Sequence, residues 1–269
     1  MQWIEISSER MPEAIRQADC VCVLPIGCIE RHGPHLPLGT DQFVIDAVAR
    51  RAAEEEPAVV FPSYYFGQIA EARHQPGTIS LPHDLLLQML RAVLDEIGRN
   101  GFRKIIIANG HGGNSGLLGY LTMSLLQEPR DYLTYTVSPY QIGPEDRERL
   151  AAMLETQGGH GGETESSCIC YLRPELVHLE DIKDPDAGRR LGRQDALEGL
   201  GSPFGWYANY PNHYAGDGRA ANAEKGAFAI EAQVRRLVQA IRAVKADAAT
   251  PEMQREFYER AARGGMAGR

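Results

Sequence analysis

The strongest constraint on the fold is an alternation of short apolar runs with segments that carry apolar residues at helical spacing. Over roughly the first 155 residues, each run that reads as a buried strand is followed by a segment with helical periodicity. Alternation of this kind is typical of parallel βαβ units, so we expect a mainly parallel sheet covered by helices on both faces. The predicted strands span residues 20–27, 59–62, 104–108 and 132–137, and the predicted helices span 43–56, 82–100, 115–127, 144–154 and 224–246.

The segment Leu24–Asp41, LPIGCIERHGPHLPLGTD, continues from the first apolar run and is the most informative part of the chain. It places Glu30, His32, His35 and Asp41 within twelve residues. Carboxylates and imidazoles that converge at the end of a buried strand are suited to hold divalent transition metals. The alternative is a polar loop rich in proline and glycine with incidental histidines, and we favour the metal site. Asp41 is also expected to cap the helix that follows.

Two later segments present the same kinds of residue among glycines. The sequence KIIIANGHGGNS places His111 just after an apolar run, and GGHGGETESS brings together His160, Glu163 and Glu165. Glycine lets the backbone approach a bound ion or substrate closely. Because ligands collect at the carboxyl ends of parallel strands, we expect His111 and the segment around Glu30 to meet at one edge of the sheet.

Charge and composition argue against several classes of function. The 269 residues are 43% hydrophobic and 24% charged, as in ordinary globular proteins, and the formal net charge is −8. Because phosphate binding requires a basic surface, this acidic balance argues against a nucleic-acid partner. No apolar run has the length of a membrane span, and the first residues lack the pattern of a signal peptide. We therefore expect a cytoplasmic protein with no membrane partner.

Cysteines and loops complete the expected organisation. The five cysteines fit a reducing compartment, and Cys28 is interpreted as a small packed residue because no partner base for a thiolate is evident. The stretch 173–222 has little periodicity, and we expect it to form a lid or a substrate wall. We expect one domain over residues 1–269 and a frayed end after Glu252. Within the stretch 173–222, the residues that could form an aromatic wall for a planar substrate are Trp206, Tyr207, Tyr210 and His213.

The motifs, taken in order, resemble those of the creatininase (creatinine amidohydrolase) family. The resemblance rests on GCIERHGPHLPLGTD, HQPGTIS, NGHGGN, HGGETESS and GDGRAANAEKG, which follow one another between about residues 25 and 226. Membership implies a three-layer αβα sandwich with a mainly parallel sheet and a two-metal centre at the strand ends. It also implies hydrolysis of a C–N bond in a cyclic amide or formamide by a homo-oligomer, often a hexamer.

The resemblance assigns roles to the residues that match the family's motifs. Glu30 and His32 match metal ligands, Asp41 matches the aspartate that bridges two divalent ions (zinc, manganese or iron), and His111 matches a further ligand. Creatininases carry a glutamate ligand two residues after that histidine, where this chain has Gly113. This difference moves the chain away from creatinine itself. It favours branches of the family that include a formamidopyrimidine deformylase and a mycofactocin-type peptidase.

The segment HGGETESS offers a replacement for the missing carboxylate. We infer that Glu163 is the fifth metal ligand, a hypothesis that goes beyond the resemblance. His160 matches a histidine that resembles a proton shuttle, and Glu165 is expected to orient a ligand histidine. A helix N-terminus with capping carboxylates would explain His160 and Glu165 without catalysis.

The mechanism implied by these roles is attack on an amide carbon by a hydroxide shared between two metal ions. Glu30 and His111 would hold one ion, His32 and Glu163 the other, and His160 would protonate the leaving nitrogen. Two alternatives stay open, namely a two-metal phosphoesterase or isomerase, and a non-catalytic metal-binding subunit. If the chain is an amidohydrolase, its partner is a small-molecule amide substrate, and the sequence does not determine which one.

Overall fold

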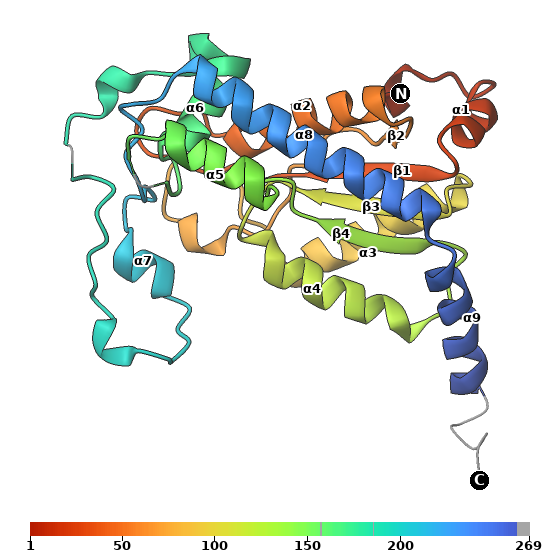
Figure 1. The fold of residues 1–269 in the computed structure, drawn as a ribbon. Coiled ribbons are helices and arrows are strands. Elements are labelled where there is room, and N and C mark those ends of the chain that lie inside the picture. Colours follow the sequence, from red (N-terminus) through yellow and green to blue (C-terminus); the bar gives the residue numbers. More distant parts are fainter. Residues whose placement is uncertain (157, 185, 263–269) are drawn as a thin grey trace.

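A parallel four-stranded sheet forms the centre of the computed structural model, which describes residues 1–156, 158–184 and 186–262 (Figure 1). The strands lie in the order β2-β1-β3-β4, and every adjacent pair is parallel, as the alternating pattern predicted. In the central pair, Ile26 lies beside Asn109, so the segments after β1 and β3 leave the sheet at the same edge. The strands are β1 (Val21–Ile26), β2 (Val59–Val60), β3 (Lys104–Asn109) and β4 (Leu133–Val137).

Helices cover both faces of this sheet, which confirms the expected αβα layers (Figure 1). Successive side chains of a strand point to opposite faces, so each strand contributes to two cores. Val23 and Ile106 pack on one face with α2 (Thr40–Glu55) and α8 (Ala223–Ala246). On the other face, Leu24 and Ile107, among others, pack with α3 (His83–Arg99) and α4 (Asn114–Ser124).

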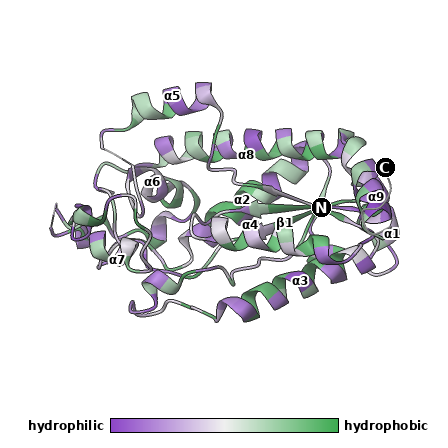
Figure 2. Cartoon of the chain, turned by 90° about the horizontal axis from the view of Figure 1, so that it is seen from below, coloured by the Kyte–Doolittle hydropathy of each residue, from purple (hydrophilic) through white to green (hydrophobic). Residues whose placement is uncertain are grey.

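The amphipathic pattern of α3 explains how a helix of this kind joins the core. Leu86, Leu90, Leu94 and Ile97 recur every three or four residues, which places them on one helical face, and all four are fully buried. Hydrophobic and hydrophilic residues alternate along α3 and α8 in Figure 2. The chain turns sharply at Gly101, whose φ of +107° is a conformation that favours glycine.

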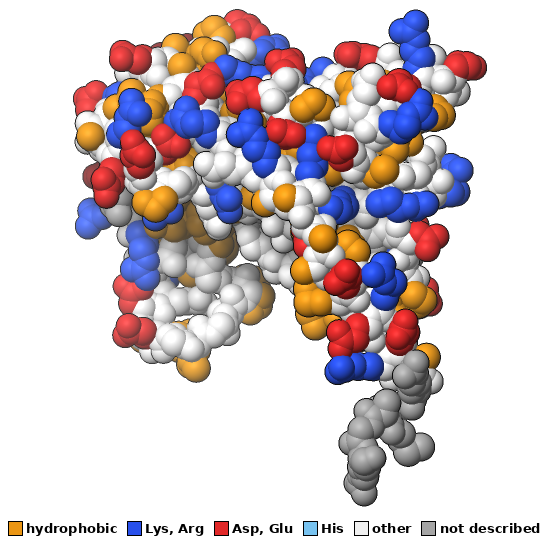
Figure 3. All heavy atoms as spheres, turned by 45° about the vertical axis from the view of Figure 1, so that its right-hand side comes forward, with side chains coloured by type: hydrophobic (Ala, Val, Ile, Leu, Met, Phe, Trp, Pro, Cys, Tyr) orange, Lys and Arg blue, Asp and Glu red, His pale blue; other side chains and the backbone are white. Residues whose placement is uncertain are grey.

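The other helices lie outside these two layers or at their ends. No helix among the described residues has the length and apolar character that crossing a membrane requires. Acidic and basic side chains are interspersed over the face that Figure 3 shows. The helices that lie outside the two layers or at their ends are α1 (Met11–Gln17), α5 (Pro144–Met153), α6 (Glu163–Leu172), α7 (Gly205–Asn209) and α9 (Ala249–Ala262). The 3₁₀ turns span 3–5, 70–72, 125–127, 174–176, 179–181 and 195–197.

The start of α2 differs from the prediction. This helix begins at Thr40 with Gly39 in the N-cap position, so Asp41 lies inside the first turn instead of capping it. A carboxylate in the first turn is favoured by the positive end of the helix dipole. The position also turns the side chain of Asp41 toward the end of β1, where it contributes to the site described below.

The chain near its C-terminal end also differs from the prediction. Instead of fraying after Glu252, it continues as α9 as far as Ala262, and residues 263–269 lie outside the described residues. The side chain of Gln254 donates a hydrogen bond to the carbonyl of Tyr132 at 3.2 Å, and the hydroxyl of Tyr258 donates another to the carbonyl of Glu128 at 2.8 Å. These contacts attach α9 to the segment that leads into β4.

Candidate metal centre

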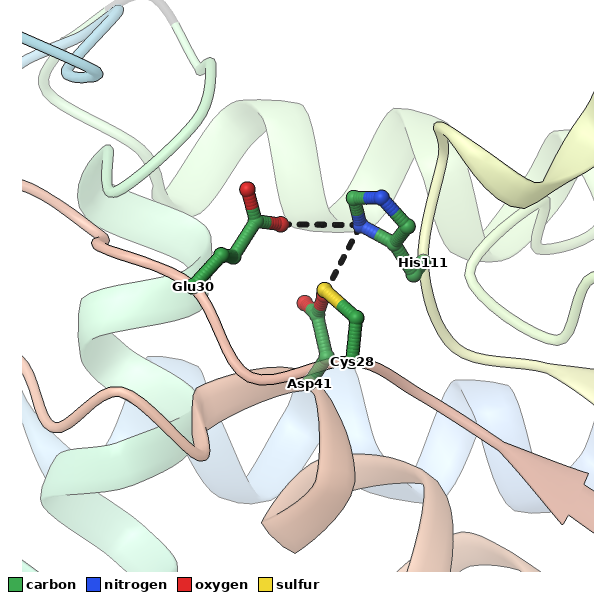
Figure 4. A group of neighbouring side chains, drawn as sticks. All are labelled: Cys28, Glu30, Asp41 and His111. Atoms are coloured by element: carbon green, nitrogen blue, oxygen red, sulfur yellow. Dashed lines mark hydrogen bonds and ion pairs between the residues drawn. The ribbon is translucent and has the colours of Figure 1, made fainter. Parts of the chain in front are cut away.

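Acidic and imidazole side chains converge where β1 and β3 end. Glu30 follows β1, Asp41 lies in the first turn of α2, and His111 follows β3. The Nδ1 atom of His111 lies 2.8 Å from Glu30 Oε1 and 2.9 Å from Asp41 Oδ2 (Figure 4). All three side chains are buried. The parallel register of the sheet thus brings together residues that are up to 81 positions apart in the sequence, from Glu30 to His111.

The imidazole of His111 is oriented to offer a lone pair toward the two carboxylates. Its Nε2 lies 2.9 Å from the backbone carbonyl of Gln68, which can only accept, so Nε2 carries the hydrogen. In the neutral ring, Nδ1 is then unprotonated and faces two carboxylate oxygens. One of them, Glu30 Oε1, is buried and accepts no hydrogen bond from the described residues. Lone pairs directed at one buried point require a cation, either a proton or a metal ion.

His32 repeats this arrangement on the other side of Asp41. Its Nδ1 lies 3.3 Å from the backbone carbonyl of Glu30, which places the hydrogen on Nδ1. Its Nε2 then faces Asp41 Oδ1 at 3.1 Å and Glu165 Oε2 at 3.8 Å. Asp41 therefore turns one carboxylate oxygen toward each of two imidazoles, as a carboxylate that bridges two cations would.

The electrostatics of the cluster favour positive charge. Burial acts to lower the pKa of His32, but the carboxylate of Asp41 outweighs it and raises that pKa to about 10. Burial acts to raise the pKa of Glu30, but the imidazole of His111 outweighs it and holds that pKa well below its usual value. In the metal-free protein, protons on the imidazoles balance the negative charge of the carboxylates, and a divalent ion can replace these protons. The donor set, two imidazoles and three carboxylates, fits two such ions, and the third carboxylate is that of Glu165.

The structure does not bring Glu163 into this cluster. Its buried carboxylate accepts hydrogen bonds from the backbone and the hydroxyl of Thr156, at 2.7 and 2.8 Å, and pairs with Lys225 Nζ at 2.6 Å. The prediction that Glu163 is the fifth metal ligand and a catalytic residue does not fit this geometry. Residues two positions apart on a helix point about 200° apart, so the first turn of α6 can direct only one of its two glutamates to the site. That residue is Glu165, which was expected only to orient a ligand histidine.

Gly113, where creatininases were expected to carry a glutamate, leaves room for the hydrogen bond that orients His111. A Cβ atom added at this position would overlap His111 Nε2 and would lie 3.1 Å from the carbonyl oxygen of Gln68. It would also lie 3.2 Å from Glu71 Oε1. A side chain at position 113 would therefore require the imidazole of His111 to shift.

His160, the expected proton shuttle, lies against the cluster. Its ring centroid is 4.2 Å from that of His32, and its Nε2 lies 2.7 Å from the backbone carbonyl of Arg31. Nε2 therefore carries the hydrogen, and Nδ1 remains able to accept one. Burial, together with the positive charge of His32, lowers the pKa of His160 to about 3. His35 is not among these groups, because its Nε2 lies 2.7 Å from the hydroxyl of Ser166.

Two more side chains reach the cluster that sequence reasoning did not assign to it. The buried thiol of Cys28 donates a hydrogen bond to Asp41 Oδ2 at 3.3 Å and lies close to Glu30 and His111 (Figure 4). The Nε2 atom of His213 contacts Glu30 Oε2. The position of Cys28, two residues before Glu30, was a usable signal. His213 was considered only as part of an aromatic wall, and no local motif marks it.

A cavity of about 540 Å³ opens onto the cluster. Its walls include the side chains of Glu30, Asp41, His111 and Glu165, together with His160. The stretch 173–222 contributes Trp206 and His213 to the same cavity, so part of the expected wall is present. A small molecule in this cavity would lie beside both imidazole–carboxylate groups.

Comparisons with known proteins show which family this chain is similar to. The sequence matches the family model described as "Creatininase: Creatinine amidohydrolase" over residues 5–241. The creatinine amidohydrolase of Pseudomonas putida is 28% identical over 196 residues, which are 67% of this chain and 75% of that protein. The mycofactocin precursor peptide peptidase of Mycolicibacterium smegmatis is 31% identical over 169 residues, which are 60% of this chain and 61% of that protein. A 2-amino-5-formylamino-6-ribosylaminopyrimidin-4(3H)-one 5'-monophosphate deformylase of Methanobrevibacter ruminantium is 29% identical over 143 residues, or 52% of this chain and 53% of that protein.

The fold is similar to that of a solved mutant creatininase described as the Zn–Zn type. The TM-score is 0.76 at 25% sequence identity, and the match covers 91% of this chain and 98% of that chain. The structures thus share the α/β fold, a parallel sheet with helices on both sides. The family model covers well over half of the sequence, and the chain belongs to the creatininase family.

Proposed function

We propose that this chain is a metal-dependent amidohydrolase that uses two divalent ions to cleave a C–N bond in a cyclic amide or formamide. The observation that carries the proposal is the pair of imidazoles on either side of Asp41. Each donates one N–H to a backbone carbonyl and turns its other nitrogen toward carboxylate oxygens. Imidazoles fixed in this way are typical of metal ligands. The creatinine amidohydrolase and deformylase relatives support the class of reaction.

Each ion has its own set of ligands in this proposal. Glu30, Asp41 and His111 hold one ion, and Asp41, His32 and Glu165 hold the other. Two such ions would supply a water of lowered pKa as the nucleophile and would polarise the substrate carbonyl. Mixed nitrogen and oxygen ligands suit zinc, manganese or ferrous iron. The zinc form of the related creatininase favours zinc as the first metal to test.

His160 is proposed to transfer the proton that the reaction requires. Because the carbonyl of Arg31 holds the Nε2 hydrogen, Nδ1 is the nitrogen that can accept a proton and deliver it to the leaving group. An amide nitrogen leaves poorly as an anion, so this proton transfer lowers the barrier for its departure. The side chain of His160 is 13% exposed and lines the cavity, which allows contact with a bound substrate.

The cavity favours a small substrate. Its volume of about 540 Å³ is within the range of small-molecule sites, and Trp206 and Tyr140 offer flat apolar surfaces to a planar amide. Assembly into a homo-oligomer, such as a hexamer, is a proposal that rests on the family alone. The cytoplasmic location stays a prediction from the sequence.

The test combines metal analysis with a substrate panel. Wild-type protein purified without oxygen is expected to contain close to two equivalents of metal and to hydrolyse a member of a panel of cyclic amides, formamides and short peptides. Chelation should abolish turnover and zinc, manganese or ferrous iron should restore it. Turnover of phosphate monoesters would favour the phosphoesterase. Metal binding without any turnover would favour the non-catalytic subunit, and failure to bind divalent metal would refute the proposal.

A further inference from the structure

We propose that Trp206 and His213 form a hydrogen-bonded relay that positions the carboxylate of Glu30 for its metal ion. This inference rests on the two-metal function proposed above and adds residues that act through a ligand. Trp206 lies on α7 and His213 follows that helix, so both belong to the stretch 173–222 and are remote from Glu30 in the sequence. Neither residue lies in one of the motifs that pointed to the metal centre.

The hydrogen bonds of the relay run in one direction only. The indole Nε1 of Trp206 is a donor and never an acceptor, and it lies 2.8 Å from His213 Nδ1. His213 Nδ1 must therefore accept. A neutral imidazole that accepts at Nδ1 carries its hydrogen on Nε2, and Nε2 contacts Glu30 Oε2. His213 consequently donates to Glu30.

This contact gives the two oxygens of Glu30 different partners. Oε2 accepts from His213, whereas Oε1 lies 2.8 Å from His111 Nδ1 and accepts no hydrogen bond from the described residues. A carboxylate that is held at one oxygen cannot rotate freely, so its other oxygen stays directed at the metal position. Glu30 is 0% exposed and His213 is 1% exposed, so bulk water has little access to either of them.

The hydrogens at the two ring nitrogens of His213 show whether this residue positions Glu30 or binds a metal ion itself. Glu30, His160 and His213 lie close enough together to form a candidate metal-binding group. A metal ligand must offer a nitrogen lone pair, and both nitrogens of His213 are already committed, one to the indole hydrogen and one to its own hydrogen. His213 therefore acts as a positioning residue and not as a metal ligand.

The backbone holds His213 in an uncommon conformation that supports this contact. Its φ of +54° lies in the left-handed region, which residues other than glycine adopt at an energetic cost. The backbone N–H of His213 donates to the carbonyl of Tyr210 at 3.0 Å, and its carbonyl accepts from the N–H of Gly33 at 3.3 Å. Conformations of this kind gather at functional sites, where the surrounding structure holds them in place.

The inference is tested by zinc affinity and by the tautomer of His213. Zinc dissociation constants are measured by competition with a chromophoric chelator for wild type, His213→Leu, His213→Gln and Trp206→Phe. His213→Leu removes the donor and should weaken zinc binding about 10- to 100-fold. His213→Gln keeps an N–H at a similar reach and should restore most of the affinity. Trp206→Phe should lose affinity to a smaller extent, and the control Tyr210→Phe, whose ring packs on Trp206, should bind as wild type does.

Nitrogen NMR of the metal-free protein is the second measurement and reports the tautomer of His213. Substituting Trp206 would not change this tautomer if Trp206 had a purely structural role. We expect His213 to be a single tautomer with hydrogen on Nε2 in wild type and a mixture in Trp206→Phe. Unchanged zinc affinity in folded His213→Leu would overturn the relay but not the proposed function. A wild-type His213 that lacks the Nε2 hydrogen would do the same. If His213→Leu does not fold, the tautomer and affinity of Trp206→Phe decide. Wild-type protein that binds neither zinc nor manganese nor ferrous iron would refute the proposed function itself.

Discussion

Replacing Glu165 by glutamine is expected to remove one of the two metal ions, whereas the same replacement at Glu163 is expected to leave both in place. The two substitutions are chemically identical and lie two positions apart on the first turn of α6. Only Glu165 faces an imidazole of the metal centre, with Oε2 at 3.8 Å from His32 Nε2. Glu163 instead pairs with Lys225 at 2.6 Å. The pair of variants therefore tests the geometry of the site with a matched control.

The size of the effect follows from the ligand sets. Glu165→Gln leaves the second ion with Asp41 and His32 and with a neutral amide in place of a carboxylate, while Glu30, Asp41 and His111 remain for the first ion. At a metal concentration of about 100 times its dissociation constant, a bound ion stabilises the folded chain by roughly 2.7 kcal/mol. For a chain of 269 residues this corresponds to a difference in Tm of about 5 °C.

The assay is metal content by mass spectrometry together with thermal unfolding, each with and without added zinc. Glu165→Gln should contain close to one ion and lose about 5 °C of the metal-induced increase in Tm. Glu163→Gln should contain two ions and keep the full increase, although its Tm without metal should fall because Lys225 loses a charged partner. The opposite result, one ion in Glu163→Gln and two in Glu165→Gln, would refute the assignment of ligands.

Three further predictions concern positions outside the two glutamates. Gly113→Ala should weaken zinc binding in a chelator competition because the added Cβ overlaps the neighbouring ligand imidazole, whereas Gly112→Ala, with open space around its Cβ, should bind as wild type does. Gly226→Ala should lower the free energy of unfolding in urea by about 1–3 kcal/mol, because its Cβ overlaps the backbone of α6, and Gly119→Ala on α4 should not lower it. Burial lowers the pKa of His35 from 6.5 to about 4, so the unfolded state binds more protons between these values and stability falls as the pH drops from 6.5 to 4. His35→Asn should lose up to about 3 kcal/mol of that pH dependence in urea titrations, and an unchanged slope would contradict the assigned shift.

The sheet and the convergence of Glu30, Asp41 and His111 could be predicted because local patterns determine them. The apolar runs before Glu30 and His111 indicated parallel strands, and parallel strands bring their carboxyl ends to one edge. The convergence of these residues with Asp41 follows from that rule and from the register of β1 and β3. The four-stranded sheet with helices on both faces agrees with the pattern for the same reason.

The choice between Glu163 and Glu165 could not be made from the sequence. Both residues lie in one short polar segment, and the rotation of α6 about its axis decides which side chain meets His32. That rotation depends on long-range contacts, among them the pairing of Glu163 with Lys225, 62 positions further along the chain. The role of His213 was equally invisible, because its contact with Glu30 spans 183 positions and depends on a backbone conformation that no local motif encodes.

The shared carboxylate of Asp41 has a thermodynamic consequence. Its Oδ1 faces His32 and its Oδ2 faces His111, so the ligand sets proposed for the two ions overlap at one side chain. Binding at one position changes the charge and the freedom of a group that the other position needs, and by linkage the reverse holds to the same extent. If the chain binds two ions as proposed, they therefore cannot load independently. Loss of Asp41 would empty both positions, whereas loss of Glu30 or Glu165 would leave one complete set of ligands.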